Sequence, residues 1–182
     1  MAGEPITGYL LVEAARGDIN AVAAQLRGVD GVQFAHALLG PTDVIAYIET
    51  PDWDSFNALL NGSIRALETS GLARHVETRL TVKPSAGSFG SSVQSPPRGS
   101  AWIFLDLDQG EPADVIAKLE AIDTVVAAHS VIGACDIVVY LECEDWGELR
   151  TVLDTQVRTI PEVVRTDTRP VLMRRPRRAR SA

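Results

Sequence analysis

Residues 44–48 read Val-Ile-Ala-Tyr-Ile, and residues 137–141 read Ile-Val-Val-Tyr-Leu. Both stretches have the length and the β-branched content of a strand, and both are apolar at odd and even positions alike. Because successive side chains of a strand point to opposite faces of a sheet, both faces of these sheets have to be buried. The two stretches therefore predict a layered fold in which every sheet face is covered.

The two stretches occupy equivalent places in an internal repeat. At an offset of 93 residues, 16 of the 57 positions from Tyr9 to Arg65 are identical to their counterparts, without a gap. After Arg65 the offset falls to 90, which aligns Thr78 with Thr168. The identical pairs include His36/His129, Gly40/Gly133, Asp43/Asp136, Tyr47/Tyr140 and Trp53/Trp146. A match of this length and kind indicates that one unit has been duplicated.

Each copy has the pattern of a β-α-β-β-α-β unit. In copy two, Pro112 and the spacing of Asp145 and Glu148 mark the two helix starts. The second helix of each copy has an apolar stripe that begins with Trp53 or Trp146, so we expect both tryptophans to pack in the core. The expected organisation is copy one at residues 7–83, a flexible Ser/Gly/Pro-rich linker at 84–100, copy two at 101–173 and a disordered Arg-rich tail at 174–182.

Two helices per copy can cover only one face of a four-stranded sheet, so the other face needs a second cover. The economical solution packs the open sheet face of one copy against that of the other, about 10 Å apart. We therefore predict an α+β fold in which two ferredoxin-like repeats pack sheet to sheet as a pseudo-dimeric α/β barrel. The sequence leaves open whether the repeats pair within one chain or between two chains.

The composition of the chain argues against several classes of function. The chain has 182 residues, with 17 basic and 24 acidic side chains, and five arginines lie in the last nine positions. The remaining 17 − 5 = 12 basic residues face 24 acidic ones, so we expect the folded body to repel duplex DNA. No apolar stretch approaches the ~20 residues of a membrane span, and no signal peptide is recognisable. The two cysteines fit no disulfide framework or zinc pattern, so we expect a cytoplasmic protein without a metal or cofactor.

Copy two runs VVAAHSVIGACDIVVYLE over residues 125–142 and, after a helix, IPEVVRTDT over residues 160–168. This order resembles the effector-binding domain of Lrp/AsnC transcriptional regulators, which has an apolar strand, a Gly-x-x-Asp turn, an apolar strand, a helix and a closing strand with paired threonines. Copy one keeps the turn at residues 40–43 but only Thr78 of the threonine pair. The resemblance implies that the protein recognises a small-molecule effector, usually an amino acid, and assembles into homo-oligomers.

One departure from the family concerns DNA. Lrp/AsnC regulators carry an N-terminal helix-turn-helix, whereas the first strand here begins near residue 8. We therefore expect no DNA-reading head and do not carry the family's DNA-binding activity over to this chain. A separate DNA-binding regulator is then the partner through which a sensed effector would act on transcription.

The two Gly-x-x-Asp turns are the best candidates for a ligand site. In the family this turn lines the effector pocket between dimers, where a carboxylate pairs with an amino group and backbone N–H groups receive a carboxylate. The closing strand adjoins this pocket. The resemblance thus implies these ligand-binding residues: Gly40, Thr42, Asp43, Gly133, Cys135, Asp136, Thr166 and Thr168. The alternative role is structural, because Gly supplies a positive φ to a tight hairpin and Asp satisfies N–H groups of the turn.

His36 and His129 share a position on the second strand of each copy. A matched pair near the pseudo-twofold axis could bind a metal or sense pH, but neither histidine has a further ligand at suitable spacing, so we expect hydrogen-bonded sheet histidines. No catalytic nucleophile or phosphate-binding loop is recognisable. The leading hypothesis is a non-enzymatic sensing module. The alternatives are a dimeric α/β-barrel enzyme that uses the inter-sheet cavity, such as a small monooxygenase or isomerase, and a structural scaffold.

Overall fold

The computed structural model describes residues 4–15, 19–82 and 89–172. The first repeat contains β1 (Ile6–Ala14), α1 (Ile19–Arg27), β2 (Val32–Ala37), β3 (Val44–Thr50), α2 (Trp53–Leu59), the π-helical turn η1 (Leu60–Ile64), α3 (Arg65–Thr69) and β4 (Ala73–Thr81). After the 3-10 turn η2 (Ser91–Gln94), the second repeat contains β5 (Ala101–Leu107), α4 (Pro112–Glu120), β6 (Val125–Ile132), β7 (Ile137–Leu141), α5 (Trp146–Val152), the π-helical turn η3 (Leu153–Val157) and β8 (Val163–Pro170). This order confirms the predicted β-α-β-β-α-β repeats.

The second helix of each repeat begins at an aspartate. Asp52 Oδ1 accepts a hydrogen bond from the backbone N–H of Ser55 at 2.7 Å. Asp145 Oδ1 accepts hydrogen bonds from the N–H groups of Gly147 and Glu148 at 2.8 and 3.0 Å. These bonds satisfy N-terminal donors that have no partner inside the helix. Each helix then contains one π-helical turn at the equivalent place, so the repeats share even this irregularity.

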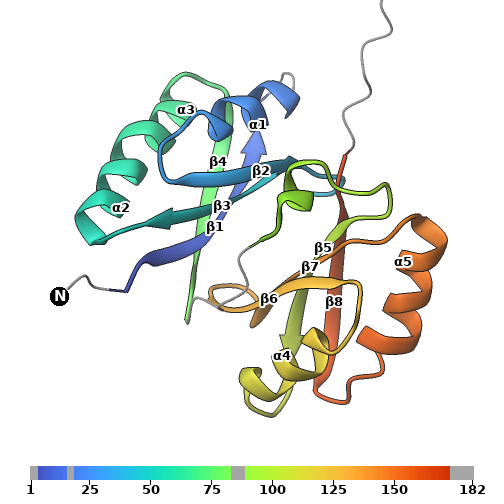
Figure 1. Ribbon diagram of the computed structural model, residues 1–182. Coiled ribbons are helices and arrows are strands. Elements are labelled where there is room, and N and C mark those ends of the chain that lie inside the picture. Colours follow the sequence, from blue (N-terminus) through green and yellow to red (C-terminus); the bar gives the residue numbers. More distant parts are fainter. Residues whose placement is uncertain (1–3, 16–18, 83–88, 173–182) are drawn as a thin grey trace, which may run out of the picture.

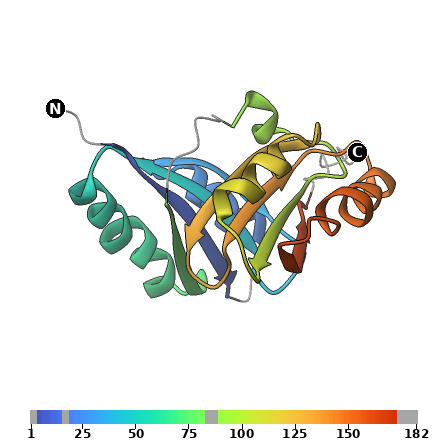
Figure 2. The same ribbon diagram turned by 90° about the horizontal axis from the view of Figure 1, so that it is seen from below.

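The central strands are buried on both faces, as their apolar sequences require. On β7, Val138 and Tyr140 lie in the core between the two repeats. The alternate residues lie in the core beneath the helices of the second repeat: Ile137, Val139 and Leu141. β3 divides between the two cores in the same way. Figures 1 and 2 show the helices on the outer sides of the two sheets, which face each other.

The two sheets join at both edges. The strand order is β2-β3-β1-β4-β6-β7-β5-β8, in which β4 pairs with β6 at Thr81↔Val131. An isolated bridge, Leu38↔Val171, connects the residues that directly follow the two outer strands, β2 and β8. Leu38 is equivalent to Val131 at the offset of 93, and Thr81 is equivalent to Val171 at the offset of 90, so the two seams are the same contact made twice. The predicted pseudo-dimeric barrel is confirmed, and its two halves come from one chain.

The segment expected to be a flexible linker differs from that expectation where it is described. Residues 83–88 lie outside the described residues, but η2 is helical and its Val93 is buried in the core between the repeats. The Val93 carbonyl accepts a hydrogen bond from His36 Nε2 at 2.7 Å. The Ser, Gly and Pro content suggested flexibility, yet an apolar side chain and a backbone carbonyl here complete a buried layer. The predicted Arg-rich tail at 174–182 lies outside the described residues.

The prediction that the two helix-starting tryptophans pack in the core is wrong. Trp53 and Trp146 are 54% and 50% exposed. Each is the first residue of its helix, and side chains of a helix tilt toward its N-terminus, so these rings project past the end of the apolar stripe. The Trp53 ring contacts Phe56 edge-on at a centroid distance of 5.5 Å.

Candidate functional site

A layer of rings occupies the core between the repeats. The Trp102 and Tyr140 rings stack at a centroid distance of 4.6 Å, and Phe34 stacks with Tyr47 at 5.8 Å. The rings that meet in this layer are those of Tyr9, Phe34, His36, Tyr47, Phe89, Trp102, His129 and Tyr140. Side chains therefore occupy the space between the sheets at this level of the barrel.

Each buried histidine is held by the first strand of the other repeat. His36 Nδ1 accepts a hydrogen bond from Trp102 Nε1 at 3.1 Å, so the proton on Nε2 is the one donated to Val93. The Tyr9 hydroxyl is hydrogen-bonded to His129 Nδ1. Tyr9 and Trp102 are equivalent residues, so the same cross-repeat contact is made twice. Burial lowers the pKa of both histidines to about 4, which keeps them neutral near pH 7.

Two buried arginines mark one end of the barrel. Arg79 on β4 and Arg169 on β8 are equivalent at the offset of 90, and they are 6% and 8% exposed. Each reaches the Gly-x-x-Asp turn of the other repeat. Arg79 Nη1 donates to Cys135 Sγ at 2.9 Å, and Arg169 Nη1 donates to Thr42 Oγ1. We call the end formed by these two arginines and the two turns they contact the arginine mouth.

Both guanidinium groups are also fixed from other directions. Arg79 Nε pairs with Glu77 Oε1 at 2.8 Å, and Arg169 Nη2 pairs with Asp167 Oδ2 at 2.7 Å. Both cations lie over the ring of Phe104 on β5, at 5.2 and 4.5 Å from its centroid. A cation over a ring face is attracted by the π electrons. The two equivalent arginines thus converge on one aromatic residue.

The glycines of the two turns make room for these arginines. A Cβ atom at Gly133 would lie 3.2 Å from Arg79 Cγ, and one at Gly40 would lie 3.5 Å from Arg169 Cγ. The φ angles of Gly40 and Gly133 are 143° and 155°, which side chains rarely tolerate. The two glycines therefore serve both the turn and the contact between the repeats.

The aspartates of the turns face the first strands of their own repeats. Asp43 Oδ2 accepts a hydrogen bond from the Ala14 N–H at 2.8 Å, and Asp136 Oδ2 accepts one from the Leu107 N–H at 2.7 Å. Both N–H groups lie where the ladder with the closing strand shifts register. A shift of this kind frees a backbone donor, and each carboxylate satisfies it. The structural alternative thus accounts for both carboxylates, and ligand contact by Asp43 and Asp136 stays a prediction.

A cavity of about 200 Å³ opens at the arginine mouth. Its lining combines three arginines and two aspartates with a ring and part of the second turn: Arg79, Arg165, Arg169, Asp106, Asp167, Phe104, Ala134 and Cys135. Burial raises the pKa of the Cys135 thiol, although the Arg79 charge opposes the shift. Cys135 therefore presents a neutral thiol. The cavity as a whole offers both charges to a small polar molecule.

The closing strand β8 places the predicted site residues Thr166 and Thr168 away from the arginine mouth. Side chains alternate along β8, so Asp167 and Arg169 face the other repeat while Thr166 and Thr168 face the helices. Thr168 lines a separate surface groove of about 410 Å³ beside Trp146 and η3. Thr166 Oγ1 accepts a hydrogen bond from Arg158 Nε at 3.2 Å. The structure therefore brings Thr42 and Cys135 to the arginine mouth and places the two threonines of β8 elsewhere.

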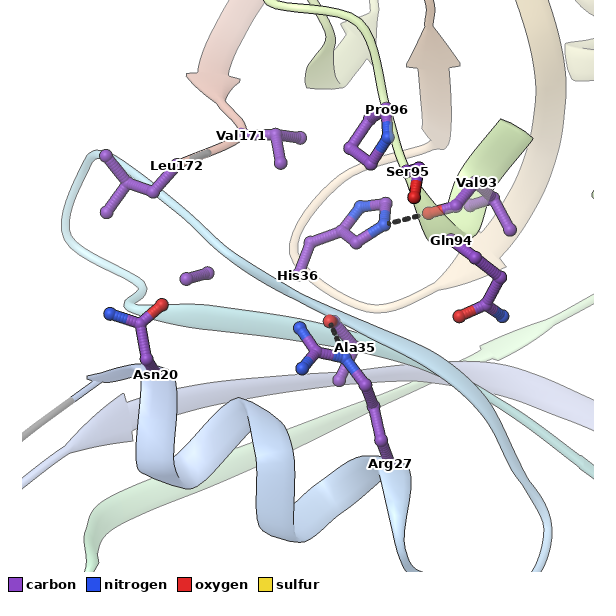
Figure 3. Close-up of a pocket in the computed structure, with 11 residues that line it drawn as sticks. Asn20, Arg27, Ala35, His36, Val93, Gln94, Ser95, Pro96, Val171 and Leu172 are labelled. Atoms are coloured by element: carbon purple, nitrogen blue, oxygen red, sulfur yellow. Dashed lines mark hydrogen bonds between the residues drawn. The ribbon is translucent and has the colours of Figure 1, made fainter. Parts of the chain in front are cut away.

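Another cavity, of about 370 Å³, lies at the seam between β2 and β8 (Figure 3). His36, Arg27 and residues 93–96 contribute to its wall. Both ring nitrogens of His36 are hydrogen-bonded within the protein, and Arg27 Nε donates to the Ala35 carbonyl at 2.9 Å. These polar groups are engaged in the fold, so the arginine mouth is the better candidate for ligand recognition.

Sequence reasoning missed Arg79, Arg165 and Arg169. The sequence contains a signal for two of them. The offset of 90 aligns Arg79 with Arg169, and in each repeat an acidic residue stands two positions before the arginine. Within the described residues, no group of three or more His, Cys, Asp or Glu side chains is placed to hold a metal ion. None of the described helices is long and apolar enough to cross a membrane.

Comparison with known proteins yields one family and several structural neighbours. The family model of the Lrp/AsnC ligand binding domain matches the chain twice, over residues 7–81 and 100–180. No curated protein is similar enough in sequence to count as a match. AsnC of E. coli is 20% identical, with 66% of this chain and 81% of that chain covered and a TM-score of 0.42.

Two further solved structures extend over both repeats. A siroheme decarboxylase in complex with an iron-uroporphyrin III analogue is 7% identical, covers 91% of this chain and 70% of its own, and has a TM-score of 0.58. A putative chlorite dismutase is 13% identical, covers 93% of this chain and 95% of its own, and has a TM-score of 0.53. At these identities the likeness concerns the fold alone.

Proposed function

The chain belongs to the Lrp/AsnC ligand binding domain family, and we propose that it is a sensing module whose effector is an amino acid. The observation that carries this proposal is the cavity at the arginine mouth. Its lining places guanidinium groups and carboxylates within about 200 Å³. A free amino acid carries both matching charges, and cavities for drug-sized ligands are larger, about 300–1,000 Å³.

The arrangement fits the two ends of an amino acid. Arg165 can donate to the α-carboxylate through its planar guanidinium, which matches carboxylate geometry. Asp106 and Asp167 can accept from the α-ammonium group. Phe104 and Cys135 offer an apolar ring and a neutral thiol to the side chain. Asp167 and Cys135 are already positioned by their contacts with Arg169 and Arg79.

The same residues connect the site to the contact between the repeats. Arg169 pairs with Asp167 on its own strand and reaches Thr42 in the other repeat. An effector that engages Asp167 therefore acts on a cross-repeat contact and, through the two turns, on the surface around the mouth. We propose that this surface meets other copies of the chain and a DNA-binding regulator. The acidic body disfavours direct contact with duplex DNA.

The proposal includes the absence of enzymatic activity. The matched buried histidines and the shared fold of a siroheme decarboxylase favour the alternative of a barrel enzyme. Against it, the ring layer occupies the inter-sheet space where such an enzyme would hold its substrate, and both histidines are hydrogen-bonded to that layer. A new absorption band on titration with an iron porphyrin would favour the enzyme instead.

Thermal unfolding in the presence of each common amino acid at millimolar concentration tests the proposal. A ligand at 100 times its Kd adds about 2.7 kcal/mol to the free energy of unfolding, which raises Tm by about 5–10 °C in a chain of this size. For the amino acid that binds, its methyl ester and its 2-oxo acid should raise Tm far less, because each lacks one charge.

Two variants make the test specific to the site. Asp106→Asn removes a charge that lines the cavity, so it should abolish the ligand-induced rise in Tm. Asp108→Asn makes the same change two residues further on, at an exposed position outside the lining, and should keep the rise. If no amino acid stabilises the unmodified protein, the sensor proposal is wrong.

A further inference from the structure

We propose that the arginine mouth binds one net-neutral amino acid per chain, in a cavity lined mainly by the second repeat, and that Arg165 binds the carboxylate of this ligand. The inference rests on the proposed sensing function. It goes further by specifying the stoichiometry, the charge class of the ligand and the residue that binds its carboxylate. A duplicated chain would otherwise be expected to hold one ligand in each repeat.

The first step is that the two equivalent arginines share one cavity. Arg79 and Arg169 both line the cavity of about 200 Å³ and both lie over the ring of Phe104. They come from opposite repeats, so they approach the pseudo-twofold axis from both sides. A site on this axis occurs once per chain, and its volume is below that of pockets for drug-sized ligands. One small molecule is what the mouth can hold.

The second step is that the cavity is built unequally. Phe104 has Leu11 as its counterpart, which offers no ring face to a cation. Ala134 has Pro41 as its counterpart, a bulkier residue in the turn. Arg165 has His75 as its counterpart, and the lining contains Arg165 but not His75. The second repeat therefore supplies the ring, the space and the extra guanidinium group.

The third step identifies which arginine is available to a ligand. Arg79 and Arg169 are held in short ion pairs of 2.8 and 2.7 Å, and both are nearly buried. Arg165 is different, because its side chain is 73% exposed and its pair with Asp106 is long, at 3.4 Å. A ligand carboxylate can therefore take a guanidinium N–H of Arg165 without breaking a short pair. Asp106 is then left beside the ligand's ammonium group.

The fourth step is the charge balance of the mouth. Arg79 is matched by Glu77, Arg169 by Asp167 and Arg165 by Asp106. Each of the three guanidinium groups is thus matched by one carboxylate, while the carboxylates of the two turns, Asp43 and Asp136, accept backbone N–H groups and lie outside the cavity lining. A zwitterion with an uncharged side chain preserves this balance. An acidic or basic side chain would add an unmatched charge to a partly buried site, which is costly.

Isothermal titration calorimetry with matched amino acids tests the inference. L-glutamine against L-glutamate and L-asparagine against L-aspartate differ in charge at nearly constant shape, and L-methionine against L-lysine adds the opposite charge. We expect at least one neutral member to bind with a stoichiometry of one per chain. We expect its charged counterpart to bind at least tenfold more weakly.

A pair of reciprocal variants tests the role of Arg165. Arg165→His gives the second repeat the residue of the first, and it should weaken binding at least tenfold because a bidentate donor to the carboxylate is lost. His75→Arg makes the opposite exchange at the counterpart position and should leave affinity and stoichiometry unchanged. Both positions are exposed, so an unchanged unfolding midpoint will confirm that each variant is folded.

The outcomes separate the inference from the proposed function. Two neutral ligands per chain, tighter binding of the charged amino acids, or equal effects of the two variants would each refute the inference while leaving a sensor of amino acids. Absence of binding by every compound would refute both. One neutral ligand, lost in Arg165→His and kept in His75→Arg, supports the inference.

Discussion

Tyr9 and Trp102 occupy the same place in the two repeats, and each is hydrogen-bonded to the histidine of the other repeat. Arg79 and Arg169 are likewise equivalent, but one meets a thiol and the other a hydroxyl. The repeats are thus alike in the histidine contacts of the ring layer and in the pairing at the seams, and they differ at the arginine mouth. The cross-repeat contacts of the two histidines are hydrogen bonds of the same kind, whereas the cross-repeat contacts of the two arginines reach different acceptors.

The largest effect of a single substitution is expected where the two halves meet. Trp102 is completely buried in the ring layer, whereas Trp146 is half exposed. Trp102→Ala should lower the free energy of unfolding by about 3–5 kcal/mol, because it opens a cavity and leaves His36 without its donor. Trp146→Ala should cost about 0.5 kcal/mol, as for other surface changes. Urea unfolding of both variants measures the difference, and similar losses would contradict the description of the ring layer.

The two tryptophans also show how far the sequence predicts this fold. The unbroken apolar runs at residues 44–48 and 137–141 sufficed to predict paired sheets, because strand alternation is a local property. The stripe of the second helix predicted buried tryptophans, but periodicity does not report where the sheet beneath a helix ends. Trp53 and Trp146 are the first residues of their helices, and both are about half exposed.

The site was less predictable than the fold for a related reason. Arg79 lies 56 residues from Cys135, and Arg169 lies 127 residues from Thr42. Only the packing of the two repeats brings these residues together. The guanidinium group of each arginine also pairs with an acidic side chain on its own strand. The turns were recognised because their glycine and aspartate act locally, within one hairpin. The arginines that complete the site act across the barrel.

Acid should destabilise the ring layer through both histidines. The pKa of His36 and His129 is about 4 in the folded protein, below the ordinary value of 6.5, and burial is the main cause. Between pH 6.5 and 4 both histidines are therefore protonated in the unfolded chain but largely neutral in the folded protein. The free energy of unfolding falls as the pH decreases through this range. The loss should reach about 3 kcal/mol per histidine at pH 4.

Variants of the two histidines show how much of this loss of stability comes from each repeat. Urea unfolding at several pH values between 4 and 7 should show a shallower pH dependence for His36→Gln and for His129→Gln. Each variant should remove about half of the histidine contribution, because the contact is made twice. If one variant removes the whole dependence and the other none, the two contacts are not equivalent.

The smallest expected effect is the difference in the free energy of unfolding between the variants Arg169→Met and Arg79→Met. Methionine keeps most of the apolar stem and removes the charge, so Arg169→Met and Arg79→Met should each cost about 1–3 kcal/mol, limited by the partial exposure of the paired acids. Arg169→Met should cost more, because a hydroxyl accepts hydrogen bonds better than a thiol and because Arg169 lies closer to the Phe104 ring. Urea unfolding at pH 7 ranks the two. A greater loss in Arg79→Met would mean that the thiol contact, and not the hydroxyl contact, holds the barrel closed at this end.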